Sequence, residues 1–214
     1  FEINGYVHQM PYTYYTQNGI ADLPPGFEGG QNSRFSREIA LECMSCHNAQ
    51  TNHESASSNK YNSIPQGIDC ERCHGPGEMH VKRKLAGEII DTSKYIDYTI
   101  VNPSKLSSSL QFDICRRCHL QGTSVLQNGK YWNDFIPGTP LSETMDTYIS
   151  RYENDESFIM ASHVDRLQQS DCFKVGGISC ISCHNPHKSV TTLNNNYFNN
   201  KCISCHINCE ETPN

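Results

Sequence analysis

The sequence predicts a mostly irregular and α-helical fold, made of small helices with little or no sheet. Only 36% of the 214 residues are hydrophobic and the mean hydropathy is −0.61, whereas globular domains are about 45–50% apolar. Residues that favour turns, namely Asn, Ser, Gly and Pro, are spread along the chain. The 12 cysteines are the third observation, because most of them recur in one short motif.

That motif is Cys-x-x-Cys-His, which attaches haem in c-type cytochromes. The two thiols add to the haem vinyl groups as thioethers, and the adjacent histidine binds the iron on one face. Five copies are present: Cys43, Cys46 and His47; Cys70, Cys73 and His74; Cys115, Cys118 and His119; Cys180, Cys183 and His184; and Cys202, Cys205 and His206.

Other uses of Cys-x-x-Cys explain this pattern less well. Tetrahedral zinc sites do not need a histidine directly after each cysteine pair. A thioredoxin-like redox motif occurs once, and a disulfide framework does not constrain the following residue. Histidine occupies only 10 of 214 positions, so five chance matches are implausible. We therefore expect the small helices to wrap around a stack of five covalently bound haems c, which supply the apolar surface that the chain lacks.

The remaining histidines match the remaining iron positions in number. Five histidines lie outside the motifs: His8, His53, His80, His163 and His187. We expect each to be the distal ligand of one haem, which makes all five irons six-coordinate, bis-histidine and low-spin. Methionine is the competing distal ligand, at Met10, Met44, Met79, Met145 or Met160.

Spacing limits which iron each distal histidine can reach. His80 and His187 lie six and three residues after the proximal histidines of their own motifs. Each is expected to reach a neighbouring haem, and the same reasoning applies to His53. His8 precedes Cys43 by 35 residues on a flexible-looking stretch, from which it could fold back or reach into the next molecule.

Cys172 and Cys209 lie outside the motifs. Because haem attachment takes place outside the cytoplasm, in an oxidising compartment, we expect a disulfide between them. Two free or intermolecular thiols are the alternative.

The chain is expected to consist of an aromatic, Gly- and Pro-rich N-terminal arm, 1–35, and a pentahaem domain, 36–214, with a haem-free insertion at about 123–160. Helices are expected from Ser36 into the first motif, over 78–86, from 107 to a stop at Gly122, over 161–172 and over 197–207. A short helix followed by a turn is expected within 142–158.

Charge and composition restrict the partners. The net charge is −6 and no long basic block exists, which argues against nucleic acid. No run is long enough to span a membrane, and no signal peptide is visible. The chain starts at Phe1 without methionine, which suggests a processed chain or fragment. A periplasmic or extracellular location follows from the haem chemistry.

Beyond the haem motifs, several ordered blocks resemble a known family. They are RFSREIALECMSCHNA, PQGIDCERCHGPGEMHV, VNPSKL, CRRCHLQGTS, PGTPL, RLQQSDCF and GISCISCHNPH. This set resembles the multihaem c-type cytochromes that carry a CHGPG motif and are often fused to tetratricopeptide repeats. Those proteins are distantly related to the tetrahaem c-prime-like electron carriers of ammonia oxidisers.

The resemblance implies closely stacked haems, electron transfer outside the cytoplasm, and haem ligation by His80 and His187. Family members often continue into further haem motifs and a repeat domain, which suggests a stand-alone or assembled haem unit here. We expect an electron carrier whose partners are other redox proteins or copies of itself. One version is a subunit of an extracellular cytochrome filament (a homopolymer, or nanowire), with His8 donated to the neighbour. The alternative is an oxidoreductase acting on a small nitrogen or sulfur compound at a five-coordinate haem.

Overall fold

The computed structural model describes residues 1–27, 34–120, 122–149 and 162–206. About one-third of the structure is helical, and the strands form small sheets of two strands each. The chain divides into two compact units, each described by itself below. Unit 1 contains Phe1–Val101, Leu126–Pro137 and Ser142–Asp146, and unit 2 contains Asn102–Val125, Gly138–Leu141 and Thr147–Asn214.

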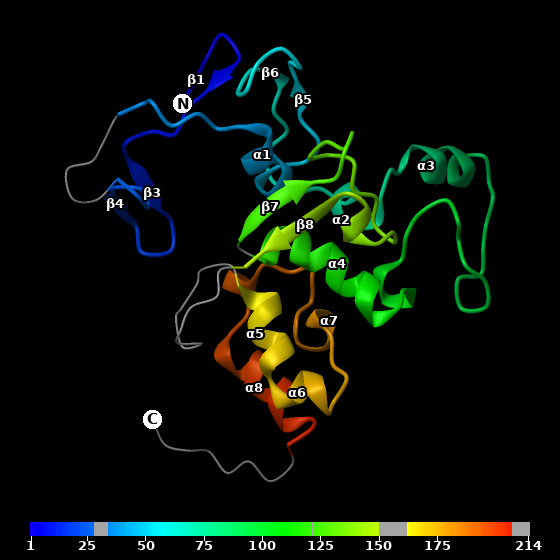
Figure 1. The fold of residues 1–214 in the computed structure, drawn as a ribbon. Coiled ribbons are helices and arrows are strands. Elements are labelled where there is room, and N and C mark those ends of the chain that lie inside the picture. Colours follow the sequence, from blue (N-terminus) through cyan, green and yellow to red (C-terminus); the bar gives the residue numbers. More distant parts are fainter. Residues whose placement is uncertain (28–33, 121, 150–161, 207–214) are drawn as a thin grey trace. The chain divides into compact units, whose positions relative to one another are not determined.

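Unit 1 begins with two hairpins where an irregular arm was expected (Figure 1). In the first, Asn4 and Gly5 have φ values of 51° and 85°, as a two-residue hairpin turn requires. The hairpins and the elements that follow them are β1 (Glu2–Ile3), β2 (Tyr6–Val7), β3 (Thr13–Tyr15), β4 (Ile20–Asp22), α1 (Leu41–His47), β5 (Asn52–His53), β6 (Tyr61–Ser63), α2 (Glu71–His74) and α3 (Glu78–Leu85).

The core of unit 1 joins the N-terminal strands to the first motif. Val7, Met44 and Tyr61 form a buried cluster. Backbone hydrogen bonds run from the Tyr61 amide to the Gly5 carbonyl and from the Ile39 amide to the Val7 carbonyl. These bonds hold residues near Ile39 in extended backbone, and α1 therefore starts at Leu41 and not at Ser36 as expected.

Unit 2 is mainly helical. Its elements are η1 (Pro103–Lys105), α4 (Ser108–His119), α5 (His163–Gln169), α6 (Asp171–Lys174), α7 (Cys180–Cys183), η3 (Val190–Thr192) and α8 (Asn195–Ile203). Helix α4 packs against α5, α5 against α6, and α7 against α8. Phe112 and Phe173 meet edge to face with ring centroids 5.2 Å apart. The buried Asp113 carboxylate accepts the Leu141 amide at 2.9 Å.

The short helix predicted within 142–158 is wrong over Met145–Tyr148, which form a strand. After the short η2 (Leu141–Glu143), the backbone forms β8 (Met145–Tyr148), which pairs with β7 (Thr123–Leu126). The Gln127 amide donates to the Thr144 carbonyl at 2.9 Å, and the Gln127 side chain donates to Asp146 at 2.9 Å. These non-local partners favour a strand over a helix. The rest of that segment lies outside the described residues.

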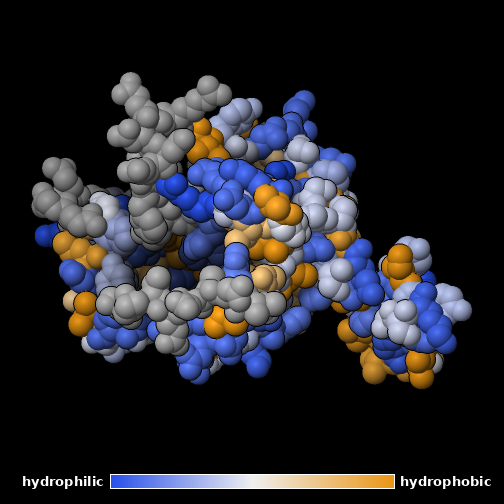
Figure 2. Space-filling model, turned by 90° about the horizontal axis from the view of Figure 1, so that it is seen from below, coloured by the Kyte–Doolittle hydropathy of each residue, from blue (hydrophilic) through white to orange (hydrophobic). Residues whose placement is uncertain are grey.

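The surface is rich in apolar side chains. Among the described residues, large apolar side chains that are exposed outnumber those that are buried. On the face drawn in Figure 2, apolar residues are interspersed with polar ones. The polypeptide alone therefore leaves much apolar surface uncovered, as expected if other apolar groups cover it. No helix in the described part of the chain is long and apolar enough to cross a membrane.

Candidate haem sites

Each Cys-x-x-Cys-His motif lies on or at the end of a short helix. Residues three apart on a helix share a face, so the two cysteines share a face in the motifs whose cysteines both lie within a helix, those of α1, α4 and α7. The motifs occupy α1, α2 with its preceding residue Cys70, the last turn of α4, α7 with His184, and the end of α8 with the turn that follows it. This local geometry is what thioether attachment and proximal ligation require.

In the second motif, the proximal histidine is oriented by a backbone carbonyl. His74 Nδ1 lies 2.7 Å from the Val101 carbonyl oxygen. That oxygen can only accept a hydrogen bond, so Nδ1 carries a proton and donates it. Metal-bound histidines commonly have this arrangement, with the second ring nitrogen donating to a carbonyl. His74 therefore fits the ligand role.

The Gly75-Pro76-Gly77 turn leads from the second motif into α3. Gly75 has φ +75°, a conformation that favours glycine. The Glu71 carboxylate accepts the Gly77 amide at 2.7 Å and so closes the turn from the α2 side. Helix α3 then begins at Glu78 and carries His80, as the sequence predicted.

His80 has its Nδ1 engaged in the same way as His74. Its Nδ1 lies 2.8 Å from the Thr99 hydroxyl oxygen. The hydroxyl donates to Asp97, so its oxygen is left to accept from Nδ1. Nε2 of His80 then has a lone pair for iron. Sequence reasoning missed Thr99 and Asp97, although Asp-x-Thr is a recognisable turn pattern.

His53 lies beside the first motif in unit 1. Its Nε2 is buried and has no hydrogen-bond partner among the described residues, and its ring is 5.2 Å from that of Tyr61. Burial raises the pKa of Tyr61 to about 12, with a further contribution from nearby Cys43. His53 also lines an open depression on the surface that includes Leu41, the first residue of α1. A buried, unpartnered imidazole nitrogen near a haem motif fits a metal ligand.

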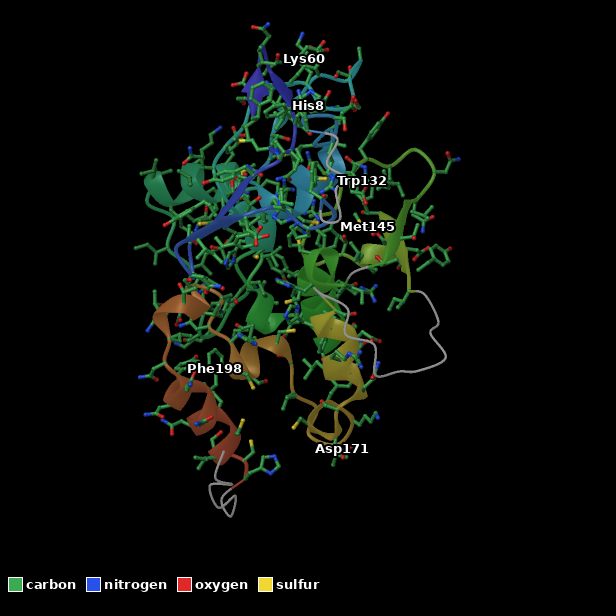
Figure 3. The ribbon with its side chains drawn as sticks, turned by 90° about the vertical axis from the view of Figure 1, so that its left-hand side faces the viewer. His8, Lys60, Trp132, Met145, Asp171 and Phe198 are labelled. Atoms are coloured by element: carbon green, nitrogen blue, oxygen red, sulfur yellow. The ribbon has the colours of Figure 1, made fainter. Side chains whose placement is uncertain are left out.

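His8 is held by its own chain and not on a flexible stretch. It forms a β-bridge with Glu38, and its Nε2 lies 3.2 Å from the side-chain amide of Asn59. Its Nδ1 is buried without a described partner. His8 and Lys60 are labelled in Figure 3. In His8, unlike His74 and His80, the contacted nitrogen is Nε2. The role of His8 as a distal ligand stays a prediction, as do those of the other four predicted distal histidines.

In unit 2, the third motif faces a predicted distal ligand. The rings of His119 and His163 stand edge to face at 88°, with centroids 5.3 Å apart. These two histidines come from different helices and would be the residues that hold the iron of the third haem, which would supply the redox chemistry. Burial, followed by the neighbouring His163 and His184, holds the pKa of His119 below its ordinary value. Because rings that stand edge to face do not both direct a nitrogen at one point, one ring would have to turn for His119 and His163 to bind one iron.

The last three motifs lie near one another in unit 2. A hydrogen bond from the Cys115 thiol lowers the pKa of Cys180. Burial raises the pKa of Cys183, and the thiols of Cys202 and Cys172 raise it further. Once these cysteines are attached to haem as thioethers they no longer titrate. Their mutual influence nevertheless shows that the cysteines of these motifs lie near one another. The fourth motif therefore lies close to both the third and the fifth.

Several of the other predicted site residues lie at the surface. His47, His187 and His206 are exposed, and the His187 amide donates to Asn185 at 3.0 Å. The His184 ring lies 5.5 Å from Phe198, which Figure 3 labels. Cys172 is exposed, but its predicted partner Cys209 lies outside the described residues. The proposed disulfide stays a prediction.

Methionine ligation is less well supported than histidine ligation. Met44 is buried in the core of unit 1, and Met145 is likewise buried. Met10 and Met79 are exposed, whereas Met160 lies outside the described residues. In the described part of the chain, no group of three or more His, Cys, Asp or Glu is arranged to hold a metal ion by itself.

Comparison with known proteins agrees with the motifs. Residues 28–75 match the family of cytochrome c554 and c-prime. The chain is also 28% identical, over 192 residues, to the multiheme cytochrome MtrA of Shewanella baltica (strain OS185). That alignment covers 80% of this chain and 54% of the relative, so the chain spans about half the relative's length. No solved structure matches. Together with the motifs, these matches support a multihaem c-type cytochrome.

Proposed function

We propose that the chain transfers electrons along five covalently bound c-type haems, each ligated by two histidines, outside the cytoplasm. The observation that carries this proposal is the way in which hydrogen bonds and burial position the imidazole rings of the predicted ligands. Nδ1 of both His74 and His80 lies within hydrogen-bond distance of an oxygen, an arrangement that is common in metal-bound histidines. Nε2 of His53 is buried and unpartnered among the described residues.

Bis-histidine ligation suits electron transfer because it leaves no iron position open for a substrate. The edge-to-face pair of His119 and His163 supports such ligation at the third haem. A six-coordinate low-spin haem changes oxidation state with little rearrangement of its ligands. The haem supplies the redox chemistry, and the chain's own residues hold it, fix the ligand tautomers and exclude water from its faces.

The positions of the motifs in unit 2 suggest the order of three haems. The hydrogen bond between Cys115 and Cys180 and the packing of α7 against α8 support a sequence of third, fourth and fifth haem. Because the motifs are this close, electrons could pass between their haems without a mobile carrier. The partners at the ends of such a relay would be other redox proteins.

A filament in which His8 binds a haem iron of the neighbouring subunit is less well supported than binding of His8 to a haem of its own chain. His8 is bonded to Asn59 and Glu38 of its own chain. A filament of copies of this chain, if it forms, therefore need not take this histidine from a neighbour.

The test uses the full chain matured with covalently attached haem. Pyridine haemochrome absorbance and mass spectrometry would count the haems on the 24.2-kDa polypeptide, and redox titration would count the electrons taken up. We expect five haems, reversible uptake of five electrons and wholly low-spin spectra. A high-spin ferric haem that binds small nitrogen or sulfur compounds would instead favour the oxidoreductase.

A further inference from the structure

One short segment, 97–101, contacts both histidines that flank the Gly-Pro-Gly turn. The Val101 carbonyl accepts from His74, and the Thr99 hydroxyl accepts from His80. The segment therefore holds a proximal ligand of the second motif and a proposed distal ligand on α3. None of its residues belongs to a haem motif.

The contact to His80 continues to a carboxylate. The Thr99 hydroxyl donates to Asp97 Oδ1 at 2.5 Å, and the Thr99 amide donates to the same oxygen at 3.0 Å. A hydroxyl has one proton to give, so the donor order runs from His80 Nδ1 to Thr99 and from Thr99 to Asp97. Asp97 Oδ2 is also 3.5 Å from His80 Nδ1.

A cation from the same helix balances this carboxylate. Lys84 Nζ lies 2.8 Å from Asp97 Oδ2, and Lys84 follows His80 by four residues, on the same face of α3. The Asp97 side chain is only 8% exposed. The ion pair with Lys84 favours the charged form of this carboxylate.

We infer that Asp97 is a positioning residue that sets the reduction potential of the haem whose iron His80 binds. Acting through Thr99, it fixes the Nδ1–H tautomer and increases electron donation from Nε2, which stabilises ferric iron. Lys84 offsets the negative charge and limits that effect. This inference rests on the proposed function, because it requires His80 to be an iron ligand.

Three single variants of the haem-loaded full chain separate this role from a general charge effect, with spectroelectrochemical titration as the measurement. Asp97→Asn should shift one haem to higher potential, and Lys84→Met should shift the same haem to lower potential. Thr99→Val changes no charge but breaks the hydrogen-bond path. It should also raise that potential and change the low-spin EPR signal of one haem.

A control variant is available at Asp91, six residues before Asp97 and more exposed to solvent. Asp91 accepts the Ser93 amide at 3.1 Å and the Ser93 hydroxyl at 2.6 Å, and it pairs with Lys94 at 3.5 Å. It thus repeats the turn and the ion pair of Asp97, and its partners among the described residues are Ser93 and Lys94, with no histidine. Asp91→Asn should leave every haem potential unchanged.

The inference is overturned if Thr99→Val leaves all potentials unchanged, or if Asp91→Asn shifts them as much as Asp97→Asn. If Asp97→Asn does not retain five haems, the shift in haem potential of Lys84→Met tests the inference in its place. This variant should fold, because the Lys84 side chain is 30% exposed and Met keeps its apolar stem. A wholly low-spin His80→Ala variant would remove His80 as a ligand and this inference with it, while leaving electron transfer standing. Loss of haem binding by the unaltered chain would instead overturn the proposed function.

Discussion

The rings of His119 and His163 stand edge to face, 5.3 Å apart, although 44 positions separate them in the sequence. His119 ends α4 and His163 begins α5, and these two helices pack together. Helix packing therefore brings a proximal histidine and a proposed distal one into ring contact.

Removing the distal ring should change the spin state of one haem. In His163→Ala, the third haem loses its sixth ligand, and we expect about one-fifth of the iron to become high-spin, because five-coordinate ferric haem is typically high-spin. EPR of the oxidised protein measures this fraction. Gln168→Ala, at an exposed position of the same helix, is the control and should remain low-spin. An unchanged spectrum for His163→Ala would assign the sixth ligand elsewhere.

The Asp113 carboxylate should contribute to the stability of unit 2. It accepts the Leu141 amide at 2.9 Å and Arg116 Nε at 2.8 Å. Asp113→Ala removes both acceptors, and hydrogen bonds to charged groups contribute about 1.5–3 kcal/mol each. We therefore expect the free energy of unfolding in urea to fall by at least about 1.5 kcal/mol.

Asp171 provides the comparison for this variant. It is exposed at the first turn of α6, where a charge contributes about 0.3–1 kcal/mol. Asp171→Ala should therefore cost less than Asp113→Ala, and equal costs would show that the buried hydrogen bonds contribute little.

Two glycines allow backbone strain to be separated from steric conflict. Gly5 and Gly87 both have φ +85°, but a Cβ on Gly5 would lie 2.7 Å from the Tyr61 carbonyl oxygen, whereas one on Gly87 would meet nothing within 4 Å. Both alanine variants should lose about 1–2 kcal/mol through the left-handed backbone. Gly5→Ala should lose more, as measured by its urea midpoint, because the Tyr61 backbone must also move. A larger loss for Gly87→Ala would contradict the contact between Gly5 and β6.

Stability should fall at alkaline pH partly through Tyr61. Its folded pKa is raised from 10.0 to about 12 by burial, so the unfolded chain releases this proton first. The contribution is present below about pH 10 and is lost as the pH rises toward about 12. Tyr61→Phe should show a shallower decline in urea midpoint over that window. Tyr12→Phe, at an exposed position, should behave like the unaltered chain.

The sequence predicted well what depends on local patterns. The helix carrying His80 begins at Glu78 and ends just before Gly87, because its start follows a Gly-Pro-Gly turn and its end precedes a left-handed glycine. The Asn4-Gly5 hairpin was predictable from the same kind of signal and was missed.

What the sequence could not predict depends on contacts between distant segments. The backbone near Ile39 is extended because its amide donates a hydrogen bond to the Val7 carbonyl. No local sequence pattern predicts that partner. The pairing of His119 with His163 likewise comes from the packing of α4 against α5. Spacing restricted the choices for each distal histidine, but only packing could select among them.

The most direct test of the central claim is a Mössbauer spectrum of the haem-loaded chain enriched in ⁵⁷Fe, since it reports every iron. With five bis-histidine haems, all the iron should be low-spin in both the ferric and the ferrous protein. A high-spin component equal to one-fifth of the iron or more would contradict bis-histidine ligation at all five haems.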